Sequence, residues 1–158
     1  MAGNLRFSNP NTLAKPPGYS YVVEATGPNR LIYFAGQLGV DMDNQFVGSD
    51  FRAQCAQAFD NMTRALEAAG AQWRDVVKIN NFLVDIAANL AAFREVRDRY
   101  LNKAAPPAST TVGVPALARP GGLFEIEAIA VLPAKAAAKA TSGGAKKKKG
   151  RATKTKRR

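Results

Sequence analysis

The sequence predicts an α+β domain in which two helices lie on one face of a single mixed sheet. Two segments carry apolar residues at steps of three and four, which is the spacing of one helix face. Other segments are short and rich in β-branched and aromatic residues, as strands are. Their order, β-β-α-β-α-β-β, favours a layer of helices packed against one sheet.

The first two predicted strands are residues 21–25 and 31–35. Gly27-Pro28-Asn29 lies between them and is typical of a turn, so we expect a hairpin. Residues 1–20 are rich in Pro, Asn and Gly and predict an irregular lead-in.

Helical spacing predicts a first helix over residues 50–69, begun by a cap at Ser49 or Asp50 and ended by Gly70. A second helix is expected over residues 88–101, before Pro106-Pro107.

Between the helices, residues 76–85 predict a strand whose apolar alternation slips at Asn80-Asn81, where we expect a bulge. Two more strands, near residues 110–114 and 124–132, complete the domain, with a loop over residues 115–122.

The basic residues are concentrated at the C-terminus. Residues 1–133 hold 12 bases and 12 acids, while 11 of the 23 Lys and Arg residues fall after residue 133, without an acid. We therefore expect a neutral domain over residues 1–133 and a disordered Lys/Arg-rich tail over residues 134–158. Such a tail favours nonspecific nucleic-acid binding. A role in solubility alone, or binding to an anionic membrane surface, are the alternatives.

Composition excludes several chemistries. The chain has no His and one Cys, so it lacks Ser-His-Asp and Cys-His nucleophilic sites and the usual Cys/His zinc sites. We expect neither a cofactor nor a metal. No segment approaches the roughly 20 apolar residues of a membrane span, and no signal-peptide core is evident, so a cytoplasmic protein is expected.

Five short motifs follow one another over residues 5–133. They are Gly18-Tyr19-Ser20, Phe34-Ala35-Gly36-Gln37-Leu38, Asp75-Val76-Val77-Lys78, Pro107-Ala108-Ser109 and Glu125-Ile126-Glu127-Ala128-Ile129-Ala130. In this order they resemble the signatures of the RidA/YjgF (reactive intermediate deaminase, Rid) family. The resemblance implies a chorismate-mutase-like protomer, a homotrimer, and small-molecule clefts between subunits. It also implies hydrolysis of enamines and imines, such as 2-aminoacrylate, to keto acids and ammonia.

Two positions depart from the family pattern. Archetypal members hold the substrate carboxylate with an Arg at the position of Ser109, and they carry a cleft Asn at the position of Arg97. A guanidinium binds a carboxylate through two charge-assisted hydrogen bonds, whereas a serine offers one neutral donor. We therefore expect an Arg-lacking branch of the family, with weak or absent 2-aminoacrylate deaminase activity.

The resemblance nominates Glu125 as the carboxylate that positions the attacking water, and a carboxylate can act as a general base without His. A strand-end ion pair is the alternative. Tyr19 corresponds to the family's cleft tyrosine. The alternative is an aromatic side chain that only packs the N-terminal segment. Gly36 brings a backbone amide close to the ligand, or else marks a bulge.

Ser109 is expected to line the cleft as a wall or weak donor. Arg97 either restores the carboxylate anchor or forms an ion pair with Asp98 or a partner subunit. Arg94 and Arg119 are weaker candidates for that anchor. Glu127 is expected to have a structural partner, and Cys55 to lie in the core.

Three functions remain open from the sequence. The first is a hydrolase or deaminase acting on imine-like or related carbonyl compounds. The second is a non-catalytic ligand-binding trimer that associates with nucleic acid through its tail. An endoribonuclease ranks below both, because the chain has no His and no evident phosphate-cutting group of residues.

Overall fold

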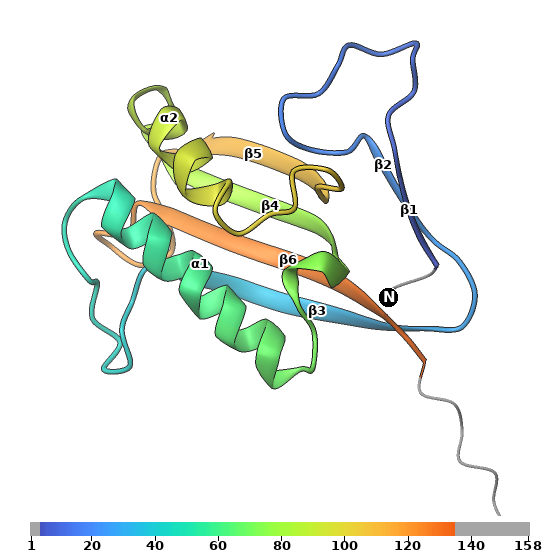
Figure 1. Ribbon diagram of the computed structural model, residues 1–158. Coiled ribbons are helices and arrows are strands. Elements are labelled where there is room, and N and C mark those ends of the chain that lie inside the picture. Colours follow the sequence, from blue (N-terminus) through green and yellow to red (C-terminus); the bar gives the residue numbers. More distant parts are fainter. Residues whose placement is uncertain (1–3, 135–158) are drawn as a thin grey trace, which may run out of the picture.

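A four-stranded mixed sheet forms the centre of the computed structural model, which describes residues 4–134. The strands lie in the order β3-β6-β4-β5, and β4 and β5 are the parallel pair. Figure 1 shows both helices on the same face of this sheet. The bounds are β3 Asn29–Leu38, β4 Val76–Val84, β5 Ala108–Val114, β6 Phe124–Pro133, α1 Phe51–Ala68 and α2 Ile86–Arg97. The predicted α+β class is confirmed.

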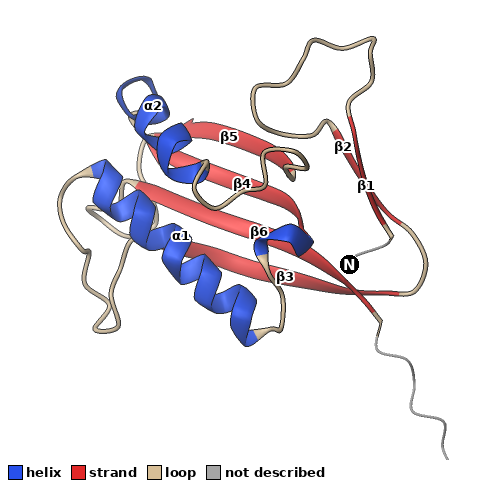
Figure 2. Ribbon diagram, viewed as in Figure 1, coloured by secondary structure: helices blue, strands red, loops and turns tan. Residues whose placement is uncertain are grey.

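The core lies between α1 and the two central strands. In β6, buried residues alternate with half-buried ones, and Phe124 and Ile126 face the helices without exposure. Cys55, Phe59 and Met62 of α1 are equally inaccessible. Because the other sheet face carries no helix, the half-buried β6 side chains point to an open face (Figure 2).

The predicted capping of α1 is confirmed. Asp50 accepts a hydrogen bond from the amide of Ala53 at 2.9 Å, and Gly70 follows the helix with φ of 73°. A 3-10 turn over Trp73–Asp75 then leads into β4.

The second helix begins two residues earlier and ends four residues earlier than its spacing predicted. Asp85 caps its start, and turns follow Arg97. Tyr100 and Leu101 still pack on the core from those turns, which explains why the apolar pattern runs past the helix.

The predicted hairpin is wrong. β2 (Val22–Ala25) pairs antiparallel with β1 (Leu5–Ser8), in the segment expected to be irregular, and these strands form a separate sheet. β3 pairs with β6 instead. The turn between β2 and β3 therefore redirects the chain from one sheet to another.

The expected bulge at Asn80-Asn81 is also misplaced. The register of β4 with β6 shifts between Val76 and Lys78. Asn81 instead takes an inward position in a regular strand, between the buried Ile79 and Leu83. A polar residue on the buried face, and not an extra residue, breaks the apolar alternation.

Within the described residues, no helix is both long and apolar enough to cross a bilayer. The predicted basic tail lies outside the described residues, apart from Ala134.

Candidate functional site

A cleft of about 570 Å³ lies at the β5 edge of the sheet. Its walls come from residues 17–21, from α2, and from the adjoining parts of β4 and β5. Three of the predicted site residues line it together, namely Tyr19, Arg97 and Ser109. The amide of Ser20 donates to the carbonyl of Pro107 at 3.2 Å, which fastens the segment carrying Tyr19 to the chain just before β5.

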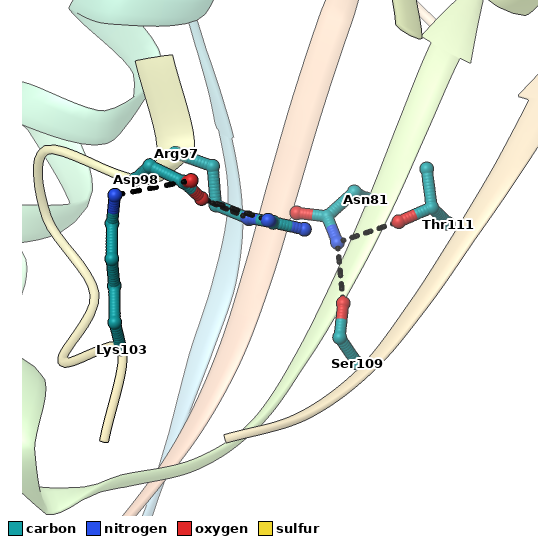
Figure 3. Close-up of polar contacts among 6 residues, drawn as sticks. All are labelled: Asn81, Arg97, Asp98, Lys103, Ser109 and Thr111. Atoms are coloured by element: carbon teal, nitrogen blue, oxygen red, sulfur yellow. Dashed lines mark hydrogen bonds and ion pairs between the residues drawn. The ribbon is translucent and has the colours of Figure 1, made fainter. Parts of the chain in front are cut away.

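Arg97 is the best-fixed charged group of the cleft. It ends α2 with only 7% of its surface exposed, and its Nε and Nη2 donate to Asp98 Oδ1 at 3.0 and 2.7 Å. Figure 3 shows the Asp98 carboxylate between Arg97 and Lys103, whose Nζ lies 3.6 Å from Asp98 Oδ2. The predicted alternative of an Arg97–Asp98 ion pair is thus present, and Arg97 still lines the cleft.

Two further contacts hold the guanidinium in place. Its central carbon lies 5.6 Å from the centre of the Phe93 ring. Gly18 packs so closely that a Cβ there would lie 2.6 Å from Arg97 Nη2. A fixed guanidinium loses little side-chain entropy when it binds an anion.

The ion pair also sets the protonation of Asp98. Burial alone would raise the pKa of this carboxyl, but the hydrogen bonds and positive charge of Arg97, aided by Lys103, outweigh burial and lower the pKa below its ordinary value. Asp98 therefore stays ionised near neutral pH and keeps Arg97 oriented.

Asn81 lies behind Ser109 and is completely buried. Its Nδ2 donates to Ser109 Oγ, the Thr110 carbonyl and Thr111 Oγ1 at 3.2, 3.0 and 3.3 Å. A carbonyl can only accept, so this bond fixes which end of the amide is nitrogen. Because Ser109 Oγ accepts from Asn81, its own proton remains available to a ligand.

The carbonyl end of Asn81 has no partner among the described residues, although it is buried. In Figure 3 this oxygen and the Arg97 guanidinium point toward one another. An unpaired buried acceptor costs about 1–3 kcal/mol, so such groups are rare away from functional sites.

Gly36 and Glu125 form a second group, away from this cleft. Two residues of β3, Ala35 and Gly36, lie opposite one residue of β6, and this bulge brings Gly36 under the Glu125 side chain. Glu125 alternates with buried neighbours and so belongs to the open sheet face. Neither residue lines the cleft that holds Arg97.

Of the remaining predicted candidates, one lines the cleft and the others lie outside it. Arg94 lines the cleft and is exposed. Arg119 instead bonds Asn44 and stacks on Phe46, with 4.6 Å from its guanidinium carbon to the ring centre, outside the cleft. Glu127 accepts from Asn80 Nδ2 at 2.6 Å.

Cys55 is fully buried, and burial raises the pKa of its thiol to about 12, against a weaker opposing effect of Arg52. A thiol in that state is a poor nucleophile. Across residues 4–134, no three Cys, Asp or Glu side chains gather in a way that could hold a metal ion.

Two residues were missed by reasoning from sequence, namely Lys78 in the cleft lining and Asn81 behind Ser109. Asn81 carried a usable signal, since a polar residue in the buried phase of a strand needs partners. Lys78 ends the Asp75-Val76-Val77-Lys78 motif, but its place in the cleft lining depends on the pairing of β4 with β5.

The chain is similar to known proteins over most of the described residues. The chain matches the family model described as Endoribonuclease L-PSP over residues 12–132. It is 34% identical over 115 residues to the 2-iminobutanoate/2-iminopropanoate deaminase of Dermatophagoides farinae, covering 72% of this chain and 85% of the relative. It is 36% identical over 123 residues to the human protein of that name, covering 75% and 85%.

A solved structure shares the architecture. YyfB from Yersinia pestis, a protein of unknown function in the conserved Rid family, aligns with a TM-score of 0.71 at 37% identity, covering 82% of this chain and 99% of YyfB. RidA from an Antarctic Psychrobacter aligns with a TM-score of 0.60 at 35% identity, covering 72% and 89%. The chain therefore belongs to the endoribonuclease L-PSP family, which is the Rid (RidA/YjgF) family that its motifs resemble.

Proposed function

We propose that the protein hydrolyses imines and enamines of small carboxylic acids to the corresponding oxo acids and ammonia, with Arg97 as the carboxylate anchor. The observation that carries this proposal is the buried guanidinium of Arg97, fixed by Asp98 at the wall of a cleft that also exposes Ser109.

Arg97 has the donors that an anchor needs. Asp98 engages its Nε and Nη2, which leaves the Nη1 hydrogens for a ligand carboxylate. The Ser109 hydroxyl supplies a second donor, because it accepts from Asn81 and can direct its proton into the cleft. A hydrogen bond to a charged group contributes about 1.5–3 kcal/mol. The pair therefore replaces, from a different backbone position, the Arg that archetypal relatives carry where Ser109 stands.

The site is completed by a second copy of the chain. Glu125 and Gly36 belong to the open sheet face, while Arg97 belongs to the helix side. The open face also carries Tyr33, which is 72% exposed, and a hollow of about 510 Å³ beside it. A neighbour that covers this face would bring its own Arg97 cleft to the Glu125 of this copy. The homotrimer that the family resemblance implies is the assembly we propose.

In the proposed reaction, Glu125 accepts a proton from water as the water oxygen bonds to the carbon of the protonated imine, giving a neutral carbinolamine. The Gly36 amide and the Tyr19 hydroxyl hold the polar atoms of the substrate. The proton held by Glu125 then passes to the nitrogen, the C–N bond breaks and ammonia leaves, and Glu125 accepts the hydroxyl proton as the carbonyl forms. Consumption of one water and release of one ammonia balance the reaction.

The names of two relatives support this chemistry, since both are called 2-iminobutanoate/2-iminopropanoate deaminase. Because the anchor is displaced from position 109 to position 97, we expect a different preference among imines and weakened hydrolysis of 2-aminoacrylate.

Ammonia release from freshly generated 2-imino acids tests the proposal. Glu125→Gln should reduce the rate by roughly 100-fold or more, the usual contribution of a general base. Glu127→Gln is the matched control on the same strand face, because Glu127 is engaged by Asn80, and its rate should stay near that of the wild type. Ser109→Arg should raise the rate on 2-iminopropanoate.

Equal measurable rates for wild type and Glu125→Gln would remove Glu125 as the general base, whereas no ammonia release by either protein from any imine would overturn the enzymatic proposal. The non-catalytic ligand-binding trimer would then be favoured.

We also propose that the basic tail gives the protein affinity for polyanions. The favouring observation is nine bases in the last 13 residues, without an acid or an aromatic residue. Retention of DNA and RNA by the full chain should fall steeply with salt, and replacement of Lys146 to Lys149 by Gln should reduce it. Unchanged retention by that variant at low salt would remove the tail from the proposal.

A further inference from the structure

The cleft at the β5 edge contains more positive charge than a single carboxylate needs. Lys78, Arg94 and Arg97 all line it, from β4 and α2, and in the described part of the chain its lining includes no Asp or Glu. The other polar lining groups are hydroxyls, including those of Ser109 and Thr110. Hydroxyls add hydrogen-bond donors to such a site without adding negative charge.

Lys78 is held inside this lining by a neutral partner. Its Nζ donates to Thr110 Oγ1 at 2.6 Å, and within residues 4–134 no carboxylate lies within ion-pair distance of it. Burial lowers the pKa of Lys78, and the more distant Glu127 opposes this effect without offsetting it. Glu127 itself is engaged by Asn80. Lys78 and Glu127 both border the hollow on the open sheet face, but the ammonium forms no ion pair with any described residue, and an anionic ligand would supply one.

Arg94 presents a second uncompensated cation. It precedes Arg97 by three residues, so both project from the same side of α2. The adjacent Glu95 is paired with Arg52 at 2.7 Å, away from the cleft, and Arg94 has no ion pair with any described residue. Of the three cations, only Arg97 already has a carboxylate partner.

We infer that the cleft selects substrates with two carboxylates, one held by Arg97 and Ser109 and the other by Lys78 and Arg94. A substrate with one carboxylate would bind to Arg97 and Ser109. It would leave the positive charges of Lys78 and Arg94 without a counter-charge. The volume of about 570 Å³ lies in the usual range for small-molecule sites. This inference deepens the proposed function, because it assumes that the substrate enters this cleft, and it names dicarboxylic imino acids as the class.

Calorimetric binding of unreactive oxo acids tests the inference without requiring turnover. The probes are 2-oxoglutarate, 2-oxobutanoate and inorganic phosphate, each titrated into the full-length protein. We expect 2-oxoglutarate to bind roughly tenfold or more tighter than 2-oxobutanoate, the effect of one further charged hydrogen bond. Lys78→Met should remove most of this preference, whereas Lys15→Met, at an exposed position outside the cleft, should retain it.

Arg94→Gln provides a second test variant. Because Arg94 lies in α2, the result does not depend on whether a substitution in β4 disturbs the sheet. This variant lies on the exposed side of α2 and should also reduce the preference, while the exposed Arg99→Gln should not. Equal affinity for the two oxo acids in the wild type would overturn the inference. So would equal weakening of both ligands by Lys78→Met and Arg94→Gln, or phosphate binding as tight as that of 2-oxoglutarate. An inactive protein that still prefers 2-oxoglutarate would contradict only the proposed reaction.

Discussion

The Glu125 carboxylate occupies the space in which a side chain at Gly36 would begin. A Cβ built on Gly36 would lie 1.8 Å from Glu125 Oε1 and 2.7 Å from Cδ. The bulge in β3 produces this approach, since it adds a residue opposite β6 at that point. The missing side chain thus defines where the proposed catalytic carboxylate rests.

Gly36→Ala should therefore impair activity more than it impairs folding. The clashing atoms are at the end of a flexible side chain, so the carboxylate can move aside, and we expect the free energy of unfolding to fall by about 1 kcal/mol, the low end of the cost of overpacking. The rate of the proposed deaminase reaction should fall roughly tenfold or more, because the proposed base is displaced from its water. Urea unfolding and ammonia release measure the two effects.

Gly48→Ala is the matched control for this variant. A Cβ at Gly48 would lie 3.5 Å from its nearest neighbour, which is an ordinary contact. Both its stability and its rate should match the wild type. A Gly36→Ala protein with full activity would show that Glu125 does not act from the observed position.

The local features of the fold could be predicted from sequence, and the pairing of its strands could not. The Asp50 cap and Gly70 follow from chemistry within a few residues of the helix ends. The partner of β3 is β6, which lies far along the chain, and no turn between neighbouring segments encodes that choice. For this reason the hairpin rule failed for residues 21–35.

The candidate site, like the fold, could be predicted from sequence only in part. The family resemblance located Tyr19, Arg97 and Ser109, which one cleft does bring together. The contribution of Lys78 depends on the pairing of β4 with β5, and the separation of Glu125 from this cleft depends on which sheet face each strand presents. These are consequences of tertiary packing that spacing along the sequence does not carry.

Gly18→Ala should weaken ligand binding by displacing Arg97. Gly18 has φ of 94°, and its Cβ would lie 2.6 Å from Arg97 Nη2. Gly27→Ala is the control, because its φ of 78° carries a similar backbone cost while nothing lies within 4 Å of its Cβ. The positive φ should cost each variant roughly 1 kcal/mol of unfolding free energy, and Gly18→Ala should lose more because its Cβ displaces the buried Arg97. Only Gly18→Ala should lose affinity for 2-oxo acids in calorimetry, and equal affinity in the two variants would contradict the anchoring role of Arg97.

Asp98→Asn should remove a pH-dependent part of the stability. The pKa of Asp98 is lowered in the folded state, so the ionised group stabilises the fold above its unfolded pKa, and this contribution is lost as pH falls through the folded pKa. We expect the variant to be less stable by about 1–2 kcal/mol near neutral pH, a value reduced by the partial exposure of Asp98. The difference should shrink below about pH 4.

Urea unfolding at neutral and acidic pH measures this difference. Asp43→Asn is the control, since the Asp43 side chain forms no hydrogen bond or ion pair with the described residues. A stability difference for Asp98→Asn that stays constant down to acidic pH would show that ionisation of Asp98 does not stabilise the fold.

The Cys55 thiol should be protected in the native protein. Its side chain is fully buried on α1, and burial raises the pKa of the thiol to about 12, so at pH near 8 almost no thiolate is present or accessible. Reaction with a soluble disulfide reagent must then await opening of the core. Because opening of a core helix costs a large part of the folding free energy, labelling should be roughly a thousandfold slower than in urea-unfolded protein. Labelling rates measured across a urea series should rise with the unfolded fraction. Rapid labelling without urea would instead place Cys55 in a locally mobile segment and contradict its role as a core residue.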